Sequence, residues 1–155
     1  MCLVATYNRT YSSKRDIVAW TIKKKVDAFD LNIPKLHKPA YYSIFQDSYC
    51  MYLGELQPEV VIKSKIYFYC RNKNNKFFKE YRYHQGYHAF QSFEEAKSFL
   101  CSGILSTKDY CIVKAIYPAF CDYARGTFTT AGYNKNHSFK AMVGSTIKLI
   151  EEVKI

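Results

Sequence analysis

Residues 84–100 read HQGYHAFQSFEEAKSFL, and this stretch decides the fold more clearly than any other. Ser92 and Glu95 have the spacing of a capping box, in which the serine hydroxyl accepts from a backbone N–H and the carboxylate reaches back to the cap. Apolar side chains then recur at helical spacing: Phe93, Ala96 and Leu100. Gly103 can end the helix in a left-handed conformation. The stretch therefore predicts a helix over about residues 93–102.

The residues before this helix predict a turn and a short strand. Gly86 suits the turn, and the aromatic residues around it alternate as in a strand. His88 then falls at the junction between strand and helix, where backbone N–H groups and an imidazole can meet an anion. A histidine that only satisfies the fold is an equally good interpretation of His88.

Working outward, β-branched and aromatic residues indicate strands on both sides of the stretch. We expect them at residues 1–6, 16–22, 60–62, 65–70, 77–83, 110–117 and 145–153, the last with a short helix as the alternative. Lys23–Lys25 should end the second strand, and Pro118 should stop the sixth because proline cannot donate a ladder hydrogen bond. The segment 119–126 is expected to be a loop, with turns at Gly132, Asn134, Asn136 and Gly144.

Together these elements predict an α+β fold in a single domain covering residues 1–155. We expect a twisted, mainly antiparallel sheet, one main helix and long aromatic loops at one end. The length of 155 residues suits one domain with a core of its own. Fifteen tyrosines and eleven phenylalanines also favour a β-rich structure.

The formal charge of +10 favours an anionic partner: a nucleotide, a nucleic acid or an acidic protein face. A charge that only keeps the protein in solution is the alternative. No apolar run reaches the length of a membrane span, so no membrane partner is expected. The N-terminus lacks a hydrophobic signal core, and the six cysteines are therefore expected to be free thiols in the cytoplasm.

Neither a metal site nor a catalytic centre is expected. His84 and His88 are four residues apart, but Gly86 argues against a helix and no further ligands stand at zinc spacing. The cysteines lack an identifiable base, and Glu94-Glu95 and Glu151-Glu152 are adjacent and so point in different directions. No cofactor is expected either.

Aromatic and basic residues remain as candidates for ligand binding. Tyrosines can stack on a base, and an arginine can hydrogen-bond to a phosphate with two donors. The candidates are Arg15, Tyr42, Tyr49, His88, Tyr123, Arg125 and Lys140. For the tyrosines the alternative is a core face of the sheet, and for Arg125 it is a surface salt bridge.

The order of segments resembles a family of small phage and prophage proteins. The features that carry it are a strand like 16–22, a tyrosine-rich stretch ending in glycine like 42–54, Gly86-Tyr87-His88 before the helix, and a strand and loop like 116–126. The chain departs from the family in the hairpin at 63–83 and in the tyrosine before Pro118. The resemblance implies a protein that sequesters a nucleotide or cyclic-nucleotide immune signal in the cytoplasm of the host.

A weaker likeness links Gly86–Phe90 and Phe93–Ala96 to the nicotinamide pocket of ADP-ribosyltransferase folds. That likeness implies an early-strand histidine and a late catalytic glutamate, for which Trp20 and Glu151 or Glu152 are poor substitutes. The favoured hypothesis is a non-catalytic protein that captures a small anionic ligand. A nucleic-acid-binding module, an ADP-ribosyltransferase-like enzyme and an inhibitor of a host protein are the alternatives, and the oligomeric state, a homo-oligomer included, stays open.

Overall fold

A computed structural model describes residues 3–5, 9–26, 40–43, 49–50, 64–71, 76–83, 86–131 and 136–155. Its elements are β1 (Leu3–Ala5), β2 (Tyr11–Ser12), β3 (Ile17–Val26), β4 (Ala40–Ser43), β5 (Tyr49–Cys50), β6 (Ser64–Arg71), β7 (Lys76–Tyr83), β8 (Tyr87–Phe90), α1 (Phe93–Leu100), β9 (Tyr110–Tyr117), β10 (Asp122–Ala131), β11 (Asn136–Gly144) and β12 (Lys148–Val153).

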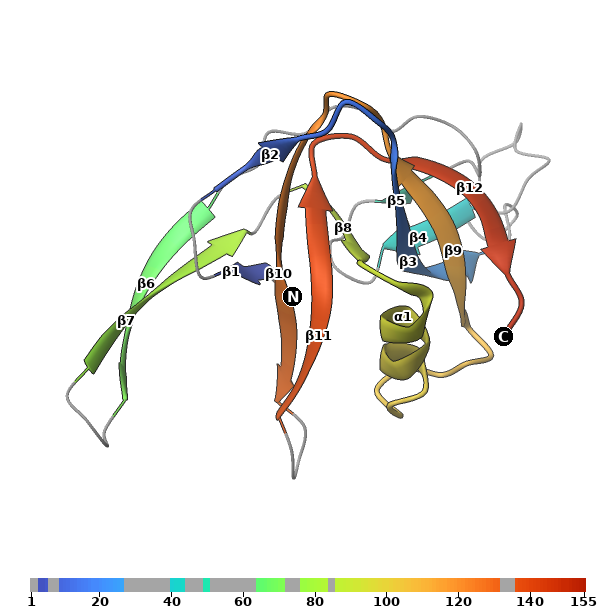
Figure 1. Ribbon diagram of the computed structural model, residues 1–155. Helices are drawn as coiled ribbons and strands as arrows, with labels where there is room; N and C mark the ends of the chain where they lie inside the picture. Colours follow the sequence, from blue (N-terminus) through green and yellow to red (C-terminus); the bar gives the residue numbers. More distant parts are fainter. Residues whose placement is uncertain are drawn as a thin grey trace.

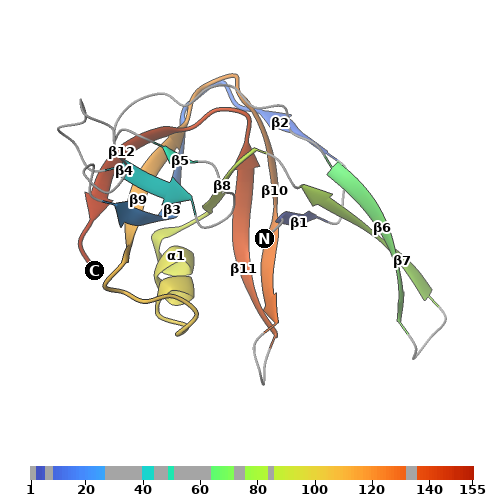
Figure 2. The same cartoon turned by 180° about the vertical axis from the view of Figure 1, so that it is seen from behind.

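The strands form one curved sheet (Figure 1). The main path runs β12-β9-β3-β8-β11-β10-β1-β7-β6, while β2 pairs with β10 and β4 pairs with both β3 and β5. Every pairing between the described strands is antiparallel. Seen from both sides, the β6–β7 hairpin extends away from the part of the sheet that α1 covers (Figure 2). The expected α+β fold with one main helix is confirmed.

Helix α1 begins where the sequence predicts it to begin. The Ser92 hydroxyl accepts from the backbone N–H of Glu95 at 3.2 Å, and Gly103 has a φ of 81° just beyond the helix. The second half of the expected capping box is wrong. The Glu95 carboxylate accepts from the backbone N–H of Lys140 at 3.1 Å, so it fastens the helix to β11 rather than reaching back to its own cap.

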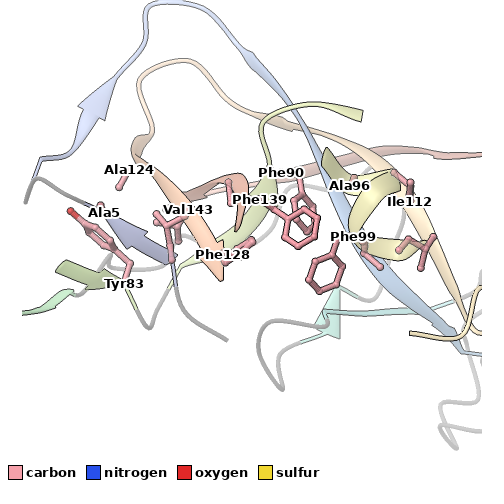
Figure 3. Close-up of a cluster of buried hydrophobic side chains, with 14 residues drawn as sticks. Ala5, Tyr83, Phe90, Ala96, Phe99, Ile112, Ala124, Phe128, Phe139 and Val143 are labelled. Carbon is pink, nitrogen blue, oxygen red and sulfur yellow. The ribbon is translucent and has the colours of Figure 1, made fainter. Parts of the chain in front are cut away.

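One face of the sheet packs against α1 around a chain of phenyl rings. Phe90 is completely buried, and its centroid lies 5.2 Å from that of Phe99, 5.5 Å from that of Phe128 and 6.3 Å from that of Phe139. Figure 3 shows these rings between the helix and β10, with Tyr83 beyond them. Aromatic pairs at such separations stabilise a core beyond the area that they bury.

The opposite face carries a second apolar cluster, built from β3, β8, β9, β10, β11 and β12. Tyr117 is its largest fully buried side chain. Its hydroxyl donates to the Tyr87 carbonyl oxygen at 2.7 Å, which satisfies a polar atom that burial would otherwise penalise. Both faces of the central strands are therefore packed.

Two sequence predictions about strands are wrong. Lys23–Lys25 do not end β3. Lys23 and Lys24 pair on one side with β4 and on the other with β9, and Lys25 pairs with β4. Lys23 is only 2% exposed. Backbone pairing and side-chain burial thus override the charge of the segment.

The second error concerns the expected loop at 119–126. Of the turns expected after it, Gly132 and Asn134 lie outside the described residues, while Asn136 begins β11 and Gly144 ends it. Residues from Asp122 onward form β10, which pairs with β11 along its length. Gly126, the last residue of that expected loop, lies inside β10, where a Cβ would collide with the backbone oxygen of Val4 on the adjacent β1. The close approach of β1 requires the glycine.

The remaining expectations fall into two groups. The hairpin of β6 and β7, the stop of β9 before Pro118 and a terminal strand rather than a helix are confirmed. The expected strand at 60–62 and most of the tyrosine-rich stretch at 41–56 lie outside the described residues. In the part of the chain that is described, no helix has the length and apolar character of a membrane span.

Candidate ligand-binding surface

Two tyrosines and two arginines gather where β2 pairs with the start of β10. Tyr11 lies opposite Tyr123 in the ladder, and their rings stack with centroids 5.6 Å apart at 29°. The guanidinium of Arg9 lies 5.6 Å from the centroid of Tyr11, and that of Arg125 lies 5.6 Å from the centroid of Tyr123. We call these four residues the arginine–tyrosine surface.

Strand periodicity explains why these four side chains meet. Tyr123 and Arg125 are two residues apart in β10 and therefore share a face, while Arg9 lies just before β2 and contacts the ring of Tyr11. The antiparallel register then brings the two Arg–Tyr pairs together. By the same alternation, the Asp122 carboxylate belongs to the other face. The local sequence therefore separates the cations from the nearest acid of β10.

The two arginine side chains are exposed. In the described part of the chain, no carboxylate forms an ion pair with Arg9 or Arg125. Tyr11 is 40% exposed, whereas Tyr123 is only 8% exposed and anchors the stack. A guanidinium held mainly against a ring keeps its N–H donors for a ligand, and its flat face can also stack on a base.

Tyr83 of β7 holds the backbone of Arg9 in place. It is 1% exposed, and the backbone of Arg9 hydrogen-bonds to its hydroxyl. Burial raises the pKa of Tyr83 above its usual value, the Arg9 hydrogen bond opposes that shift, and the nearby Tyr81 and Tyr11 add to it. The phenol is thus neutral at physiological pH, and it fixes the backbone that presents the Arg9 guanidinium.

The structure places His88 away from this surface. His88 is 3% exposed, its ring centroid is 5.7 Å from that of Phe128, and its ring nitrogens face the backbone oxygens of Gly86 at 3.1 Å and Tyr83 at 3.3 Å. Burial lowers the pKa of His88 to about 4, the two carbonyl groups oppose that shift and the charge of Lys23 adds to it. A neutral imidazole enclosed in this way does not offer a ring nitrogen to an anion, so His88 leaves the candidate site.

Of the other two basic candidates, Lys140 shares a face with the arginine–tyrosine surface. Lys140 is exposed on β11 opposite Thr127, which places it on the same face of the sheet as Arg125. Arg15 is exposed between β2 and β3, and its backbone N–H donates to the Ser13 hydroxyl at 3.1 Å. The structure therefore brings Tyr123, Arg125 and Lys140 to one face.

Tyr42 and Tyr49 belong to another part of the sheet. They lie opposite each other in the pairing of β4 with β5, and Tyr42 also lies opposite Lys24 of β3. Their side chains are outside the described residues. Neither strand pairs with β2 or β10, so the ladder does not join these tyrosines to Tyr123.

Sequence reasoning did not single out Arg9 and Tyr11. A usable signal was present: Arg9-Thr10-Tyr11 mirrors Tyr123-Ala124-Arg125, a basic and an aromatic residue two apart in each case. Such mirrored pairs face each other only if their strands run antiparallel, which the sequence alone did not establish.

The described residues contain no cluster of three or more histidine, cysteine or acidic side chains suited to a metal. Cys101 and Cys121 are free thiols, at the helix end and before β10, and the Cys111 thiol of β9 donates to the Lys23 backbone oxygen at 3.6 Å. Glu151 of β12 lies 3.7 Å from the ammonium group of Lys114 in a largely exposed ion pair. Comparison with protein-family models, with curated proteins and with solved structures found no match.

Proposed function

We propose that this protein is a non-catalytic binding protein that captures an anionic, base-bearing ligand of the nucleotide class on the arginine–tyrosine surface. The observation that carries the proposal is the pair of exposed guanidinium groups lying against stacked tyrosines with no carboxylate partner among the described residues. Arginine recognises phosphate through paired N–H donors, and aromatic rings bind the faces of bases.

The electrostatics support binding rather than turnover at this surface. Arg9 and Arg125 supply donors and charge, and the neutral Tyr83 fixes the backbone of one of them. His88, whose pKa burial lowers, is enclosed on the other side of the sheet. Capture requires affinity alone, and the resemblance to small phage proteins extends the proposal to sequestration of a nucleotide or cyclic-nucleotide immune signal.

The test is a thermal-shift screen and calorimetric titration with AMP, ADP-ribose and cyclic dinucleotides. A ligand at 100 times its dissociation constant should stabilise the protein by about 2.7 kcal/mol. In the double variant Arg9→Gln, Arg125→Gln, the affinity should fall about 100-fold, because a hydrogen bond to a charged group contributes about 1.5–3 kcal/mol.

The matched control is Lys148→Gln, Lys154→Gln, which removes the same charge from exposed positions at the C-terminal end of the chain. Its affinity should stay within about twofold of the unchanged protein, since distant exposed charges are screened at physiological salt. An equal loss in both double variants would show that net charge and not the arginine–tyrosine surface binds the ligand. Absence of binding to all the nucleotides would overturn the proposal.

A further inference from the structure

Lys140 extends the arginine–tyrosine surface along the hairpin of β10 and β11. Its backbone polar groups point away from β10: the Lys140 N–H donates to the Glu95 carboxylate at 3.1 Å, and the Lys140 oxygen accepts from the Gln91 N–H at 3.1 Å. The pairing of Lys140 with Thr127 of β10 is therefore of the non-hydrogen-bonded kind. In such a pair the two Cα atoms are only about 4.5 Å apart, and the side chains lie close together.

Arg125 belongs to the same cluster of side chains. It lies two residues before Thr127 in β10, so the two side chains share a face. Arg125 is diagonal to Lys140 across the ladder, a separation of about 7–8 Å that long side chains can bridge. Arg125 and Lys140 are exposed, and Thr127 is half-buried beside them. We call Arg125, Thr127 and Lys140 the Lys140 subsite.

The Lys140 subsite has two cations and no acid on its own face of β10 and β11. Asp122 is the only acidic residue of these two strands, and its position next to Tyr123 places it on the other face. Glu95 approaches from α1, also on the other face, and its carboxylate accepts from the backbone of Lys140. Within the described ranges, the Lys140 ammonium group takes part in no ion pair. An anion at the subsite therefore meets a guanidinium, an ammonium group and a hydroxyl, all of which can donate.

The backbone that carries both parts of the surface is held in place. Before β10, the Phe120 N–H donates to the Ser13 oxygen at 2.7 Å, and Phe120 has a left-handed φ of 65°. β10 then pairs with β11 along its length. Thr127 follows Tyr123 by four residues, which is about 14 Å of strand at about 3.4 Å per residue. The surface therefore offers two anion positions that the sheet keeps apart, one beside the stacked tyrosines and one at the Lys140 subsite.

We infer that the Lys140 subsite binds a second phosphate, so that the ligand of the surface carries phosphate on both the 3′ and the 5′ oxygen of one ribose. The inference rests on the proposed function and specifies its ligand class. Guanidinium and ammonium groups form charge-assisted hydrogen bonds to phosphate, which are about twice as strong as those between neutral groups. The two phosphates of ADP share an oxygen atom and lie side by side. A ribose holds its 3′ and 5′ phosphates apart, as the separation of the two anion positions requires.

The test is calorimetric titration with AMP, ADP and adenosine 3′,5′-bisphosphate at about 0.15 M salt, where distant charges are screened. The bisphosphate should bind about tenfold more tightly than AMP, because it gains hydrogen bonds between charged groups. ADP should bind within about threefold of AMP, since screening leaves little gain from additional charge alone.

Substitution of Lys140 isolates the second phosphate. Lys140→Gln should lower the affinity for the bisphosphate about tenfold and leave the affinity for AMP within about twofold of that of the unchanged protein. The variant keeps the backbone N–H that donates to Glu95, so its melting temperature should stay the same. Thr127→Val keeps the β-branched shape and should lower the bisphosphate affinity less, by about threefold.

The matched control is Lys148→Gln, which removes the same charge from an exposed position of β12. It should change neither affinity by more than about twofold. Equal losses in Lys140→Gln and Lys148→Gln would show that net charge attracts the second phosphate, and they would overturn the inference. A tenfold loss of ADP affinity in Lys140→Gln would also overturn it, because phosphates without a ribose between them would then reach the subsite.

The outcomes distinguish this inference from the proposed function. If AMP and the bisphosphate bind equally, depend on Arg9 and Arg125 and do not respond to Lys140→Gln, the proposed function is retained and the inference is overturned. Absence of binding to any nucleotide would overturn both.

A 3′,5′-bisphosphate arises either in a free mononucleotide or within a dinucleotide, where the 3′ phosphate bridges to the next ribose. Titration with 5′-phosphorylated diadenylate separates these sources. Tighter binding of the dinucleotide than of adenosine 3′,5′-bisphosphate would assign the bridging phosphate to the Lys140 subsite, and equal affinities would assign the free bisphosphate. Either result supports the inference only if Lys140→Gln lowers the affinity for both compounds.

Discussion

His88 and Arg125 lie in strands separated only by β11, yet their surroundings are opposite. Val143 of β11 pairs with His88 on one side and with Ala124 on the other, so His88 and Ala124 share a face while Arg125 belongs to the other. His88 is enclosed among phenyl rings and backbone oxygens, whereas Arg125 is exposed beside a tyrosine. A shift of one residue along a strand decides whether a polar side chain is buried in the core or exposed on the surface.

This difference teaches that a basic and aromatic composition does not define a binding site by itself. The buried region should respond to substitution through stability, with large free-energy changes and strong pH dependence. The arginine–tyrosine surface should respond through affinity, with little change in stability. The following predictions test that division, beginning with the largest expected effect.

The strongest effect should come from Phe90→Ala. Phe90 contacts three other phenyl rings, and its removal should lower the free energy of unfolding by about 3–5 kcal/mol because a cavity remains. Urea unfolding followed by circular dichroism measures the change. The control Ile104→Ala removes a 47% exposed apolar side chain from the segment after α1. It should cost about 0.5 kcal/mol or less, and a similar loss in both variants would contradict a packed core around Phe90.

The second prediction concerns pH. In the folded protein the pKa of His88 is about 4, below the ordinary value of 6.5. As the pH falls, the imidazole of the unfolded chain is therefore protonated before that of the folded protein. The contribution of the neutral His88 imidazole to the free energy of unfolding is complete above pH 6.5 and is lost as the pH falls toward 4. Between pH 7 and 4.5 this loss should amount to about 2.5 kcal/mol.

His88→Gln removes the titrating group, and its unfolding free energy should therefore depend less on pH by about that amount. Urea unfolding at pH 7 and pH 4.5 gives the comparison. His137→Gln, which removes an exposed imidazole, is the control and should behave as the unchanged protein. Identical pH dependence in all three proteins would place His88 in contact with solvent.

A smaller effect is expected at the helix that closes the buried region. Ser92→Ala removes the acceptor for the Glu95 N–H and should cost about 1 kcal/mol. Ser98→Ala changes an exposed serine of the same helix and should be neutral or slightly stabilising, because alanine favours helix. The difference between the melting temperatures of the two variants measures the stabilisation by the Ser92 cap. Equal melting temperatures would contradict a stabilising cap.

The smallest change in stability should follow Arg125→Gln. An exposed contact between a cation and a ring contributes about 0.5 kcal/mol, so the melting temperature should hardly move. The same variant should lower nucleotide affinity about tenfold. A large loss of stability without a loss of affinity would show that Arg125 stabilises the fold and does not bind the ligand.

Residues 84–100 and the strands with β-branched or aromatic runs could be located from the sequence because their signals are local. A capping serine, a helical apolar repeat and a proline after β9 act within a few residues. The pairing of β10 with β11 could not be predicted in this way. It depends on contacts between distant strands, and Gly126 suggests a loop until β1 is known to lie against it.

The candidate site was predictable only in part, for the same reason. Tyr123 and Arg125 were singled out by residue type, but the register that places Tyr11 opposite Tyr123 is a property of the sheet. The burial of His88 also depends on Tyr83 and Phe128, which are distant in the chain or on another strand. Residue type suggested the chemistry, and tertiary pairing determined where it occurs.

The left-handed backbone at Phe120 lowers the stability of the folded protein at a residue whose side chain is exposed. A bulky residue at such a φ costs roughly 1–2 kcal/mol, whereas glycine adopts it without penalty. A library selected for heat tolerance should therefore be enriched in glycine at this position. Those same clones would lack the most exposed large hydrophobic side chain among the residues that the structure describes.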